Sequence, residues 1–409
     1  MSIPRPRKRR AQAGGFHPPH CPNKDCTYYN PELRPQWSYR STGPYVRASD
    51  ERSFPAFQCR HCKRYFSSRT FSATYWLRYR SLFPKIVSQS VNAPGLRQVG
   101  RILGVTHATV GRHLARAGRH CLLLHRQLVQ PLQLTESLVV DGFETFEYSQ
   151  FFPFHINLAV GSRSWFLYHF TDSPLRRKGT MTARQKKIRE ELEARLGRPD
   201  PKAVETGMVQ LLSPLLRHVP AQMASVPEVK ELKVEEAKDP TPEAEAKVRK
   251  LILHSDDHRA YPRALKRLHE EGPKLVIEHR VTSSKERRTT SNPLFPVNLA
   301  DLLLRHSEAN HRRETIAFSK RRQGAIERLA VFTVWRNLVK RRREKKEGET
   351  AAMLAGLATE PWTWDRVFRG RRFVRKELLP DVWWEYYWRQ VKTTILGDNQ
   401  TVHELKYAF

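Results

Sequence analysis

The chain has 409 residues, enough for two or three domains. Lys and Arg number 73 against 41 Asp and Glu, which gives a formal net charge of +32 spread along the chain. Ordinary charged surface helices mix both signs more evenly, so we expect a polyanion, nucleic acid, as the partner. No run of about 18 apolar residues occurs, and no apolar segment follows the basic N-terminus. We therefore expect neither a membrane span nor a secretory signal.

Five cysteines are present, and four of them form two close pairs, Cys21 with Cys26 and Cys59 with Cys62. The gaps along the chain are four, 32 and two residues. This pattern indicates metal binding in a reducing compartment rather than a disulfide framework. Two pairs on two turns supply the four tetrahedral ligands that Zn²⁺ prefers, so residues 16–68 are predicted to form a zinc ribbon.

Three histidines lie near the cysteine pairs and are alternative zinc ligands: His17, His20 and His61. The fifth cysteine, Cys121, stands alone in an apolar stretch and is expected to be a buried core residue. Residues 1–15, rich in Pro, Arg and Gly, are predicted to be a disordered basic tail.

Residues 69–130 are predicted to form a helix-turn-helix DNA-binding domain. In LRQVGRILGVTHATVGRHLARAGRH, apolar residues four apart lie on one face of each of two helices. Gly104 fits the turn and Thr106 fits the N-cap of the second helix. An ordinary helical pair is the alternative. The residues expected to point outward at the start of the second helix, where base edges are read, are His107, Ala108, Thr109 and Arg112.

Short apolar runs then predict strands: SLVVD, FPFHINLAV and SWFLYHFT, with Gly142 and Gly161 as breaks between them. Helical sequence follows, with an insertion predicted around 176–250. LILHSDD and KLVIEHRV read as two further strands separated by the helix YPRALKRLHEEG, and helices are expected at 297–316 and 323–343. The basic, aromatic segment 346–409 is predicted to be a tail.

Two of the predicted strands end in acids. Asp141 ends SLVVD, and Asp256 and Asp257 follow LILHS. Carboxylates at the ends of different strands can converge at one edge of a sheet, where two divalent ions about 4 Å apart need such ligands for attack on phosphorus. A cap or a surface turn is the ordinary role of such acids, so the order of elements has to support the interpretation.

That order is the order of the RNase H-like fold, and the chain resembles the DDE insertion-sequence transposases that carry an N-terminal zinc ribbon. The resemblance covers roughly residues 16–345. It implies an α/β fold for residues 131–345, with an RNase H-like mixed sheet and flanking helices, Mg²⁺ dependence and a terminal-repeat DNA substrate. The motifs that carry it are CPNKDC with CRHC, LGVTHATVGRHL, VVDGFETF, HSDDHRAY and NHRRETIAFSKRRQGAIERLAVF.

Under this resemblance Asp141 is the first catalytic acid, and Asp256 is the second because Tyr261 follows it by five residues. The chain departs from the family at the third acid, since Asn298 stands where a Glu is expected. Asp301, one helical turn later, is the predicted third acid, and the alternative is Glu314. Asp141 and Asp256 are the predicted magnesium ligands.

Basic residues follow the predicted active site, and the run KRRREKK comes after them. A solvated helix face is the usual meaning of such runs, but this position favours a track for DNA phosphates. The predicted phosphate contacts are Arg305, Arg312, Arg313 and Lys320.

The sequence thus predicts a DDE/DDD-type transposase that binds the ends of a mobile element and catalyses metal-dependent strand cleavage and strand transfer. We expect structural Zn²⁺, catalytic Mg²⁺, double-stranded DNA as partner, a homo-oligomer in the active complex, and a cytoplasmic, nucleoid-associated location in a prokaryote. A non-catalytic DNA-binding regulator derived from a transposase is the alternative, which Asn298 keeps open. An RNA-processing nuclease is a third class, and the helix-turn-helix favours duplex DNA over it.

Overall fold

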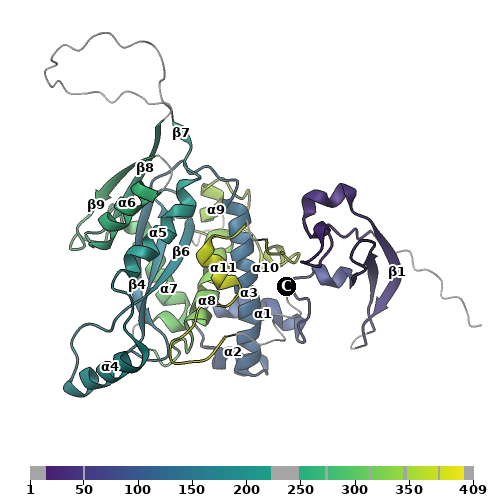
Figure 1. Cartoon of the computed structure of the whole chain (residues 1–409), viewed down its shortest axis with the longest axis horizontal. Coiled ribbons are helices and arrows are strands. Elements are labelled where there is room, and N and C mark those ends of the chain that lie inside the picture. The colour runs from purple at the N-terminus through teal and green to yellow at the C-terminus, as the bar shows by residue number, and fades with distance from the viewer. Residues whose placement is uncertain are drawn as a thin grey trace, which may run out of the picture. The chain divides into compact units, whose positions relative to one another are not determined.

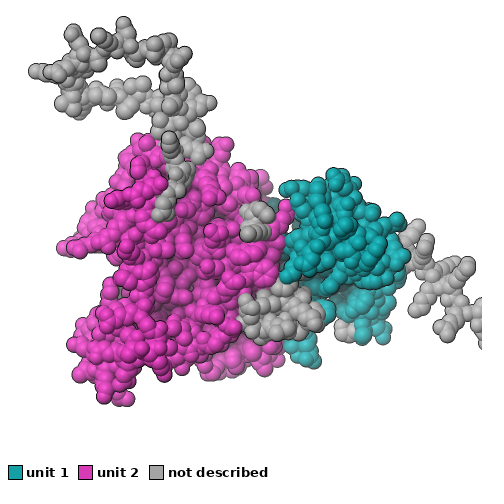
Figure 2. All heavy atoms as spheres, viewed as in Figure 1, with its two compact units in different colours: residues 1–83, 364–373, 402–409 teal, residues 84–363, 374–401 magenta. Residues whose placement is uncertain are grey.

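The computed structural model describes residues 15–48, 51–222, 248–271, 275–312, 315–343, 348–375 and 378–399. The chain forms two compact units, coloured separately in Figure 2. Unit 1 comprises residues 1–83, 364–373 and 402–409, and unit 2 comprises residues 84–363 and 374–401. This division differs from the predicted domain boundaries at residues 68 and 130, because the helices between residues 84 and 129 pack within unit 2.

Unit 1 is built on a three-stranded antiparallel sheet, β1-β2-β3. Its strands are β1 (Tyr39–Val46), β2 (Ser53–Cys59) and β3 (Tyr65–Ser67). Aromatic rings from the sheet and from the segments before and after it, among them Trp37 and Phe57, pack around the cysteines in its core. The late segment with α10 (Trp364–Val367) belongs to this unit, and the Phe373 ring centroid lies 5.4 Å from that of Phe71.

Unit 2 contains a mixed sheet in which β4 is central (Figure 1). The spatial order is β6-β5-β4-β8-β9: β4 is antiparallel to β5, β5 is antiparallel to β6, and β4, β8 and β9 are parallel. The short β7 pairs with the start of β8. The strands are β4 (Leu138–Phe146), β5 (Pro153–Gly161), β6 (Leu167–Pro174), β7 (Ala221–Gln222), β8 (Val248–Ser255) and β9 (Val276–Val281).

The central strand is longer than the sequence predicts. Asp141 does not end a strand but lies in the middle of β4, which pairs with β5 as far as Phe146. Gly142, predicted as a break, is part of this ladder. A Cβ at Gly142 would collide with the carbonyl oxygen of Ile156 and with the ring of His155, so a neighbouring strand fills the space of the missing side chain.

The helices follow the predicted order along the chain. They are α1 (Phe83–Ser90), α2 (Leu96–Leu103), α3 (His107–Val129), α4 (Ala183–Leu196), α5 (Ala203–Leu216), α6 (Ala260–Glu271), α7 (Phe295–Ser307), α8 (Arg322–Val334), α9 (Ala351–Leu354) and α11 (Asp381–Tyr387). Among the helices of the described residues, none combines the length and the apolar character needed to cross a membrane.

Helices cover both faces of the sheet, which explains why β4 and β5 are buried along most of their length. Neighbours in the register alternate between faces, so Asp141 and Gly142 point to opposite sides. Gly207 of α5 approaches Asn157 on the Gly142 side. Arg305 of α7 covers Phe143 on the Asp141 side. The face of Asp141 is therefore the face that α7 covers.

Part of the predicted insertion belongs to the core. In α5 the residues Met208, Leu211 and Leu212 are buried, and the helix packs on β5 and β6. The periodic apolar residues of MVQLLSPLLRHV thus form a core helix rather than a peripheral one. Most of the charged, Pro-containing stretch of that prediction, residues 223–247, lies outside the described residues.

The segment predicted as a C-terminal tail also completes the core. Trp383 of α11 is buried and stacks on His169 of β6, with ring centroids 4.7 Å apart and an interplanar angle of 10°. Its indole nitrogen donates to the carbonyl oxygen of Phe170 at 2.9 Å. Large aromatic side chains give this short segment enough apolar surface to fold against the sheet.

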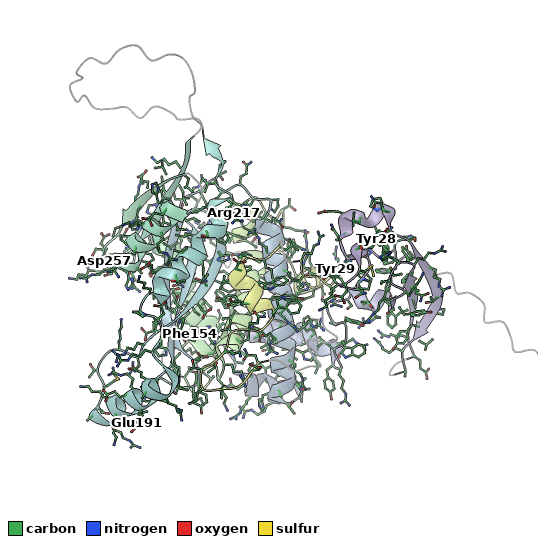
Figure 3. The ribbon with its side chains drawn as sticks, in the orientation of Figure 1. Tyr28, Tyr29, Phe154, Glu191, Arg217 and Asp257 are labelled. Carbon is green, nitrogen blue, oxygen red and sulfur yellow. The ribbon has the colours of Figure 1, made fainter. Side chains whose placement is uncertain are left out.

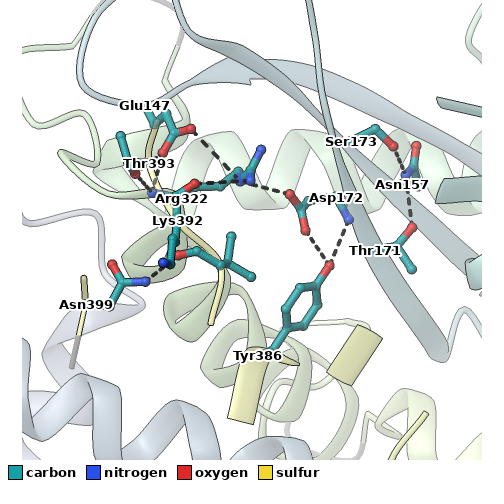
Figure 4. A network of polar contacts seen from close by, with 11 residues as sticks. Glu147, Asn157, Thr171, Asp172, Ser173, Arg322, Tyr386, Lys392, Thr393 and Asn399 are labelled. Atoms are coloured by element: carbon teal, nitrogen blue, oxygen red, sulfur yellow. Dashed lines mark hydrogen bonds and ion pairs between the residues drawn. The ribbon is translucent and has the colours of Figure 1, made fainter. Parts of the chain in front are cut away.

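A buried polar network fastens the same segment to the strands (Figure 4). Tyr386 donates to Asp172 of β6 at 2.5 Å, and Asp172 pairs with Arg322 at 3.1 Å. Glu147, just beyond β4, accepts the backbone N–H of Arg322 at 2.7 Å and the hydroxyl of Thr393. Because these groups are buried, removing one partner would leave another without its hydrogen bond.

The helix predicted at 323–343 changes after Val334 into a π-helical turn, Trp335–Val339. Asn337 of this turn accepts the backbone N–H of Leu167 and donates to its carbonyl oxygen, both at 2.9 Å. The side chain thereby satisfies backbone groups at the start of the edge strand β6, which would otherwise be open to another strand.

Close packing of α3 against α8 yields a stability prediction. A Cβ at Gly118 would lie 2.6 Å from the carbonyl oxygen of Glu327, whereas one at Gly324, also helical, would meet no atom within 4 Å. Gly118→Ala should lower the free energy of unfolding by about 1–3 kcal/mol through overpacking. Gly324→Ala should raise it by up to about 1 kcal/mol through helix propensity. Urea unfolding midpoints measure both, and similar changes for the two variants would contradict the close contact.

Candidate functional site

Four cysteines converge in unit 1. The sulfur atoms of Cys21, Cys26, Cys59 and Cys62 all lie within 4.8 Å of one another, and three of these residues are buried. Within the described ranges, no other group of His, Cys, Asp and Glu side chains meets this distance. His20 instead contacts the carbonyl oxygen of Cys21 at 2.9 Å. The cluster is therefore made of the four predicted cysteines, without a histidine.

This cluster fits a tetrahedral metal ion. A Zn–S bond of about 2.3 Å places the sulfurs of a tetrahedron about 3.8 Å apart, and the Cys21 and Cys62 sulfurs lie 3.5 Å apart. The Trp37 indole N–H donates to the Cys59 sulfur at 3.2 Å. Burial opposes ionisation of Cys59, but this bond and backbone N–H groups outweigh it and lower its pKa to about 7. Such donors stabilise a thiolate, the form that binds metal.

The purified, reduced protein should therefore contain about one zinc per chain. Cys59→Ser should lose the zinc and unfold unit 1, because a structural metal supplies folding free energy. Cys121→Ala is the matched control: Cys121 is fully buried, as predicted, but lies on α3 outside the cluster, so this variant should keep its zinc. Metal analysis of both variants measures this, and zinc-free wild-type protein would contradict the assignment.

The predicted pair of helices is present as α2 and α3, joined by a turn at Gly104 in the left-handed region, φ 65°. Thr106 caps α3 by accepting the backbone N–H of Thr109 at 3.3 Å, as predicted. His107, Ala108 and Arg112 are exposed.

The prediction for Thr109 is wrong, because this residue is buried and does not point outward. Its hydroxyl lies 3.1 Å from that of Thr106 and accepts a hydrogen bond from Arg112 at 3.3 Å. Thr109 thus supports the cap and orients the Arg112 side chain. The exposed face at this end is formed by Arg97, Arg101, Ile102, His107 and Arg112.

Carboxylates gather around Asp141 in unit 2. Asp141 of β4 accepts a hydrogen bond from the hydroxyl of Tyr261, a buried residue of α6, at 3.3 Å. Asp256 follows β8 directly, and one of its oxygens accepts the backbone N–H of His258 at 3.0 Å. These contacts fix the two predicted acids at neighbouring parallel strands.

Asp301 approaches the same place from α7, which packs on β4 and β5. One of its carboxylate oxygens is buried and has no hydrogen-bond partner among the described residues. Asn298 precedes it by one helical turn. We call Asp141, Asp256 and Asp301 the acid cluster. Since its oxygens do not all lie within 4.8 Å of one another, it is more open than the cysteine cluster.

The acid cluster is electrostatically strained. Burial, followed by the charge of Asp256, raises the pKa of Asp141 to about 6. Burial and the charge of Asp141 raise the pKa of Asp301 well above its usual range. The pKa of Tyr261 is raised by burial and then by all three carboxylates. A divalent cation with oxygen ligands would relieve this repulsion, and the unpartnered oxygen of Asp301 is a suitable donor.

Sequence reasoning missed several residues around the acid cluster. Arg288, in the loop before α7, stabilises the charged forms of both Asp141 and Asp301. The basic run KERR in that loop was a usable signal. The sequence marks Tyr261 only by its spacing from Asp256, whereas in the structure its hydroxyl donates to Asp141. Gly142 shows its role only through the approach of β5, which no single sequence reveals.

The predicted phosphate contacts differ in their surroundings. Arg312 and Lys320 are exposed, which suits a DNA contact. Arg305 is half-buried and bonded within the chain: its guanidinium lies 4.6 Å from the Phe143 ring centroid and donates to the carbonyl oxygens of His311 and Glu144, each at 3.3 Å. The remaining predicted residues of this region, Arg313 and the alternative third acid Glu314, lie outside the described residues.

Comparison with known proteins finds no matching family model and no matching curated protein.

The raised pKa values predict that, without bound metal, the acid cluster lowers the free energy of unfolding by an amount that depends on pH. The folded state favours protonated Asp141, so protonation of this residue stabilises the fold. This stabilisation is fully present below the unfolded pKa of 3.8 and is lost as pH rises through about 6. In magnesium-free buffer at pH 8, Asp141→Asn should raise the free energy of unfolding by about 1–3 kcal/mol, with a smaller gain at pH 5. Urea unfolding at both pH values measures it.

Asp257→Asn is the matched control, because the neighbouring Asp257 has an exposed side chain at the outer end of β8 (Figure 3). It should change stability little at either pH. A gain for Asp257→Asn equal to that for Asp141→Asn would show that general charge, and not the acid cluster, is responsible.

Proposed function

We propose that this chain is a transposase of the DDE/DDD type, a metal-dependent enzyme that cleaves DNA at the ends of a mobile element and joins them to target DNA. The observation that carries the proposal is that Asp256 and Asp301 both come close enough to Asp141 to interact with it electrostatically, and all three interact with Tyr261. Burial and a neighbouring carboxylate raise the pKa values of Asp141 and Asp301. Carboxylates held in this way are costly unless they bind cations.

The strand arrangement supports an RNase H-like fold for unit 2. Three strands in antiparallel succession, β4 to β6, precede two strands parallel to β4, and β4 is central. In the RNase H-like fold implied by the sequence, acids stand on the first strand, after the fourth, and on the helix after the fifth. Asp141, Asp256 and Asp301 occupy these positions on β4, after β8 and on α7.

The residues of the acid cluster would divide the work as follows. These carboxylates would hold Mg²⁺, which would supply activation of the attacking oxygen and stabilisation of the leaving oxygen. Tyr261 orients Asp141 through its hydroxyl, and the backbone N–H of His258 orients Asp256. Arg288 brings positive charge to the cluster, where the phosphate would lie. No side chain has to act as a covalent nucleophile.

DNA binding is supported by two further features. The exposed face at the start of α3 offers His107 and Arg112 for base edges, with Arg97 and Arg101 of α2 for phosphates. The net charge of +32 favours a polyanion. In unit 1 the four cysteines support a structural zinc, which would make it a zinc ribbon.

The test is strand cleavage with Mg²⁺ on duplexes that cover the DNA flanking the coding sequence. Asp141→Asn, Asp256→Asn and Asp301→Asn should each abolish cleavage, because each removes a ligand from one shared site. DNA binding should persist in all three, and without metal it should tighten slightly as repulsion of phosphate falls. Gel analysis of cleavage and a parallel binding titration measure both effects.

Two control variants sharpen the result. Asp257→Asn alters the adjacent exposed acid and should retain cleavage. Glu314→Gln alters the alternative third acid and should also retain it if Asp301 is the ligand. Near-normal cleavage by Asp256→Asn would contradict the proposal that these acids share one metal site.

The second candidate is a DNA-binding regulator derived from a transposase. The observation that favours it is Asn298 on α7, at the position where a Glu is expected. Binding to flanking DNA without cleavage by the wild-type protein on every end sequence would support the regulator over the enzyme.

A further inference from the structure

Unit 2 has a hollow beyond the acid cluster, at the far end of the β4–β5 hairpin. Its volume is about 420 Å³, within the range of small-ligand sites, about 300–1,000 Å³. We call it the hairpin pocket. The lining residues that matter here are Glu144, Phe146, Pro153, Arg177, Arg305 and Arg312.

The hairpin pocket begins close to the acid cluster. Glu144 follows Asp141 by three residues on β4, a distance of roughly 10 Å at about 3.3 Å per strand residue, and its side chain points to the opposite face of the strand. Arg305 follows Asp301 by four residues on α7, so both lie on one face of that helix. A DNA strand with one phosphate at the acid cluster would bring a neighbouring nucleotide to this pocket.

Two arginine side chains of the hairpin pocket are held in place by contacts within the chain. Arg305 is fixed by the Phe143 ring and by two backbone carbonyl oxygens. Arg177 donates to Gln150 at 3.4 Å, and its Nε is buried without a hydrogen-bond partner among the described residues. Arg189 of α4 donates to the carbonyl oxygen of Arg177 at 3.4 Å. The Arg177 guanidinium is thus half-buried and still has hydrogen-bonding capacity for a ligand.

The helix α4 keeps Arg177 at this position. Glu193 of α4 accepts two hydrogen bonds from Arg176, at 2.8 and 3.0 Å, and also pairs with Arg189 at 3.5 Å and with Arg198 at 2.9 Å. These contacts tie the end of β6 to α4. The backbone at Arg177 is therefore fastened from both sides before any ligand binds.

The other walls suit a nucleobase. Phe146 and Pro153 give an apolar surface, and the Phe146 ring lies against that of Phe318 with centroids 5.5 Å apart. Glu144 is exposed and offers a carboxylate to a base amino group. Three arginines against one glutamate leave the lining positive, which suits a phosphodiester.

We propose that the hairpin pocket binds one unpaired nucleotide of the DNA strand, adjacent to the phosphate at the acid cluster. The base lies against Phe146 and Pro153, Glu144 accepts from its amino group, and Arg177 and Arg312 bind the phosphate. A hollow of about 420 Å³ suits one nucleotide better than a base pair, so binding here would open the duplex next to the cleavage position. This inference rests on the proposed function in taking DNA as the substrate.

The test compares binding of two DNAs to the full chain in metal-free buffer by fluorescence anisotropy. One is a blunt duplex of about 30 base pairs, and the other is the same duplex with about three additional unpaired nucleotides at one 3′ end. Wild-type protein should bind the second DNA about tenfold more tightly, a typical value for one stacked base. Arg177→Gln, Arg312→Gln and Phe146→Ala should each remove this preference.

Arg263→Gln is the charge-matched control, because Arg263 is exposed on α6 and does not line the pocket. It should keep the ratio of the two affinities. A wild-type ratio near one, or equal weakening of both DNAs by the pocket variants, would overturn the nucleotide site. The readout is binding and not cleavage, so the two proposals can fail separately. Loss of the preference in the pocket variants supports the hairpin pocket. A wild-type protein that shows the preference but never cleaves DNA counts against the transposase proposal and not against the pocket.

Discussion

Repulsion among carboxylates that β4, the end of β8 and α7 bring together is the constraint on which the candidate site of unit 2 depends. Asp141, Asp256 and Asp301 come from three separate elements, and burial together with mutual repulsion raises the pKa values of Asp141 and Asp301. This arrangement costs stability at neutral pH when no cation is bound. The surrounding structure therefore has to hold the acids together against their own charge.

Close packing around the acid cluster holds the three acids in place. Tyr261, buried on α6, donates to Asp141, and Gly142 lets β5 come close to the strand that carries it. Beyond β4, the polar network around Arg322 binds the strand ends to the late segment with α11 (Figure 4). A strained site on a rigid scaffold is expected where geometry matters for binding or chemistry.

The sequence predicted what depends on local spacing. Two cysteine pairs were sufficient to predict the cluster in unit 1, because two tight turns bring the pairs together. The order of strands and helices and the Thr106 cap followed from periodicity and capping chemistry. The convergence of Asp141 with Asp256 required the resemblance as well, since an acid after a strand is common in turns.

What the sequence did not predict depends on contacts between distant segments. Gly142 looks like a break until β5 is seen against it, and Thr109 looks exposed until its hydroxyl is seen in the cap. The buried α5 lay within a predicted insertion because a charged stretch adjoins it. Trp383 looked like part of a tail, since nothing local shows that His169 is its partner.

The central claim is that Asp141, Asp256 and Asp301 share one metal site. Crystals of the full chain soaked in Mn²⁺, which takes the same oxygen ligands as Mg²⁺, test it through anomalous difference density. We expect one or two peaks between the three carboxylates in the wild type, and loss of a peak in Asp301→Asn. Peaks only at other positions, or unchanged density in Asp301→Asn, would contradict the shared site.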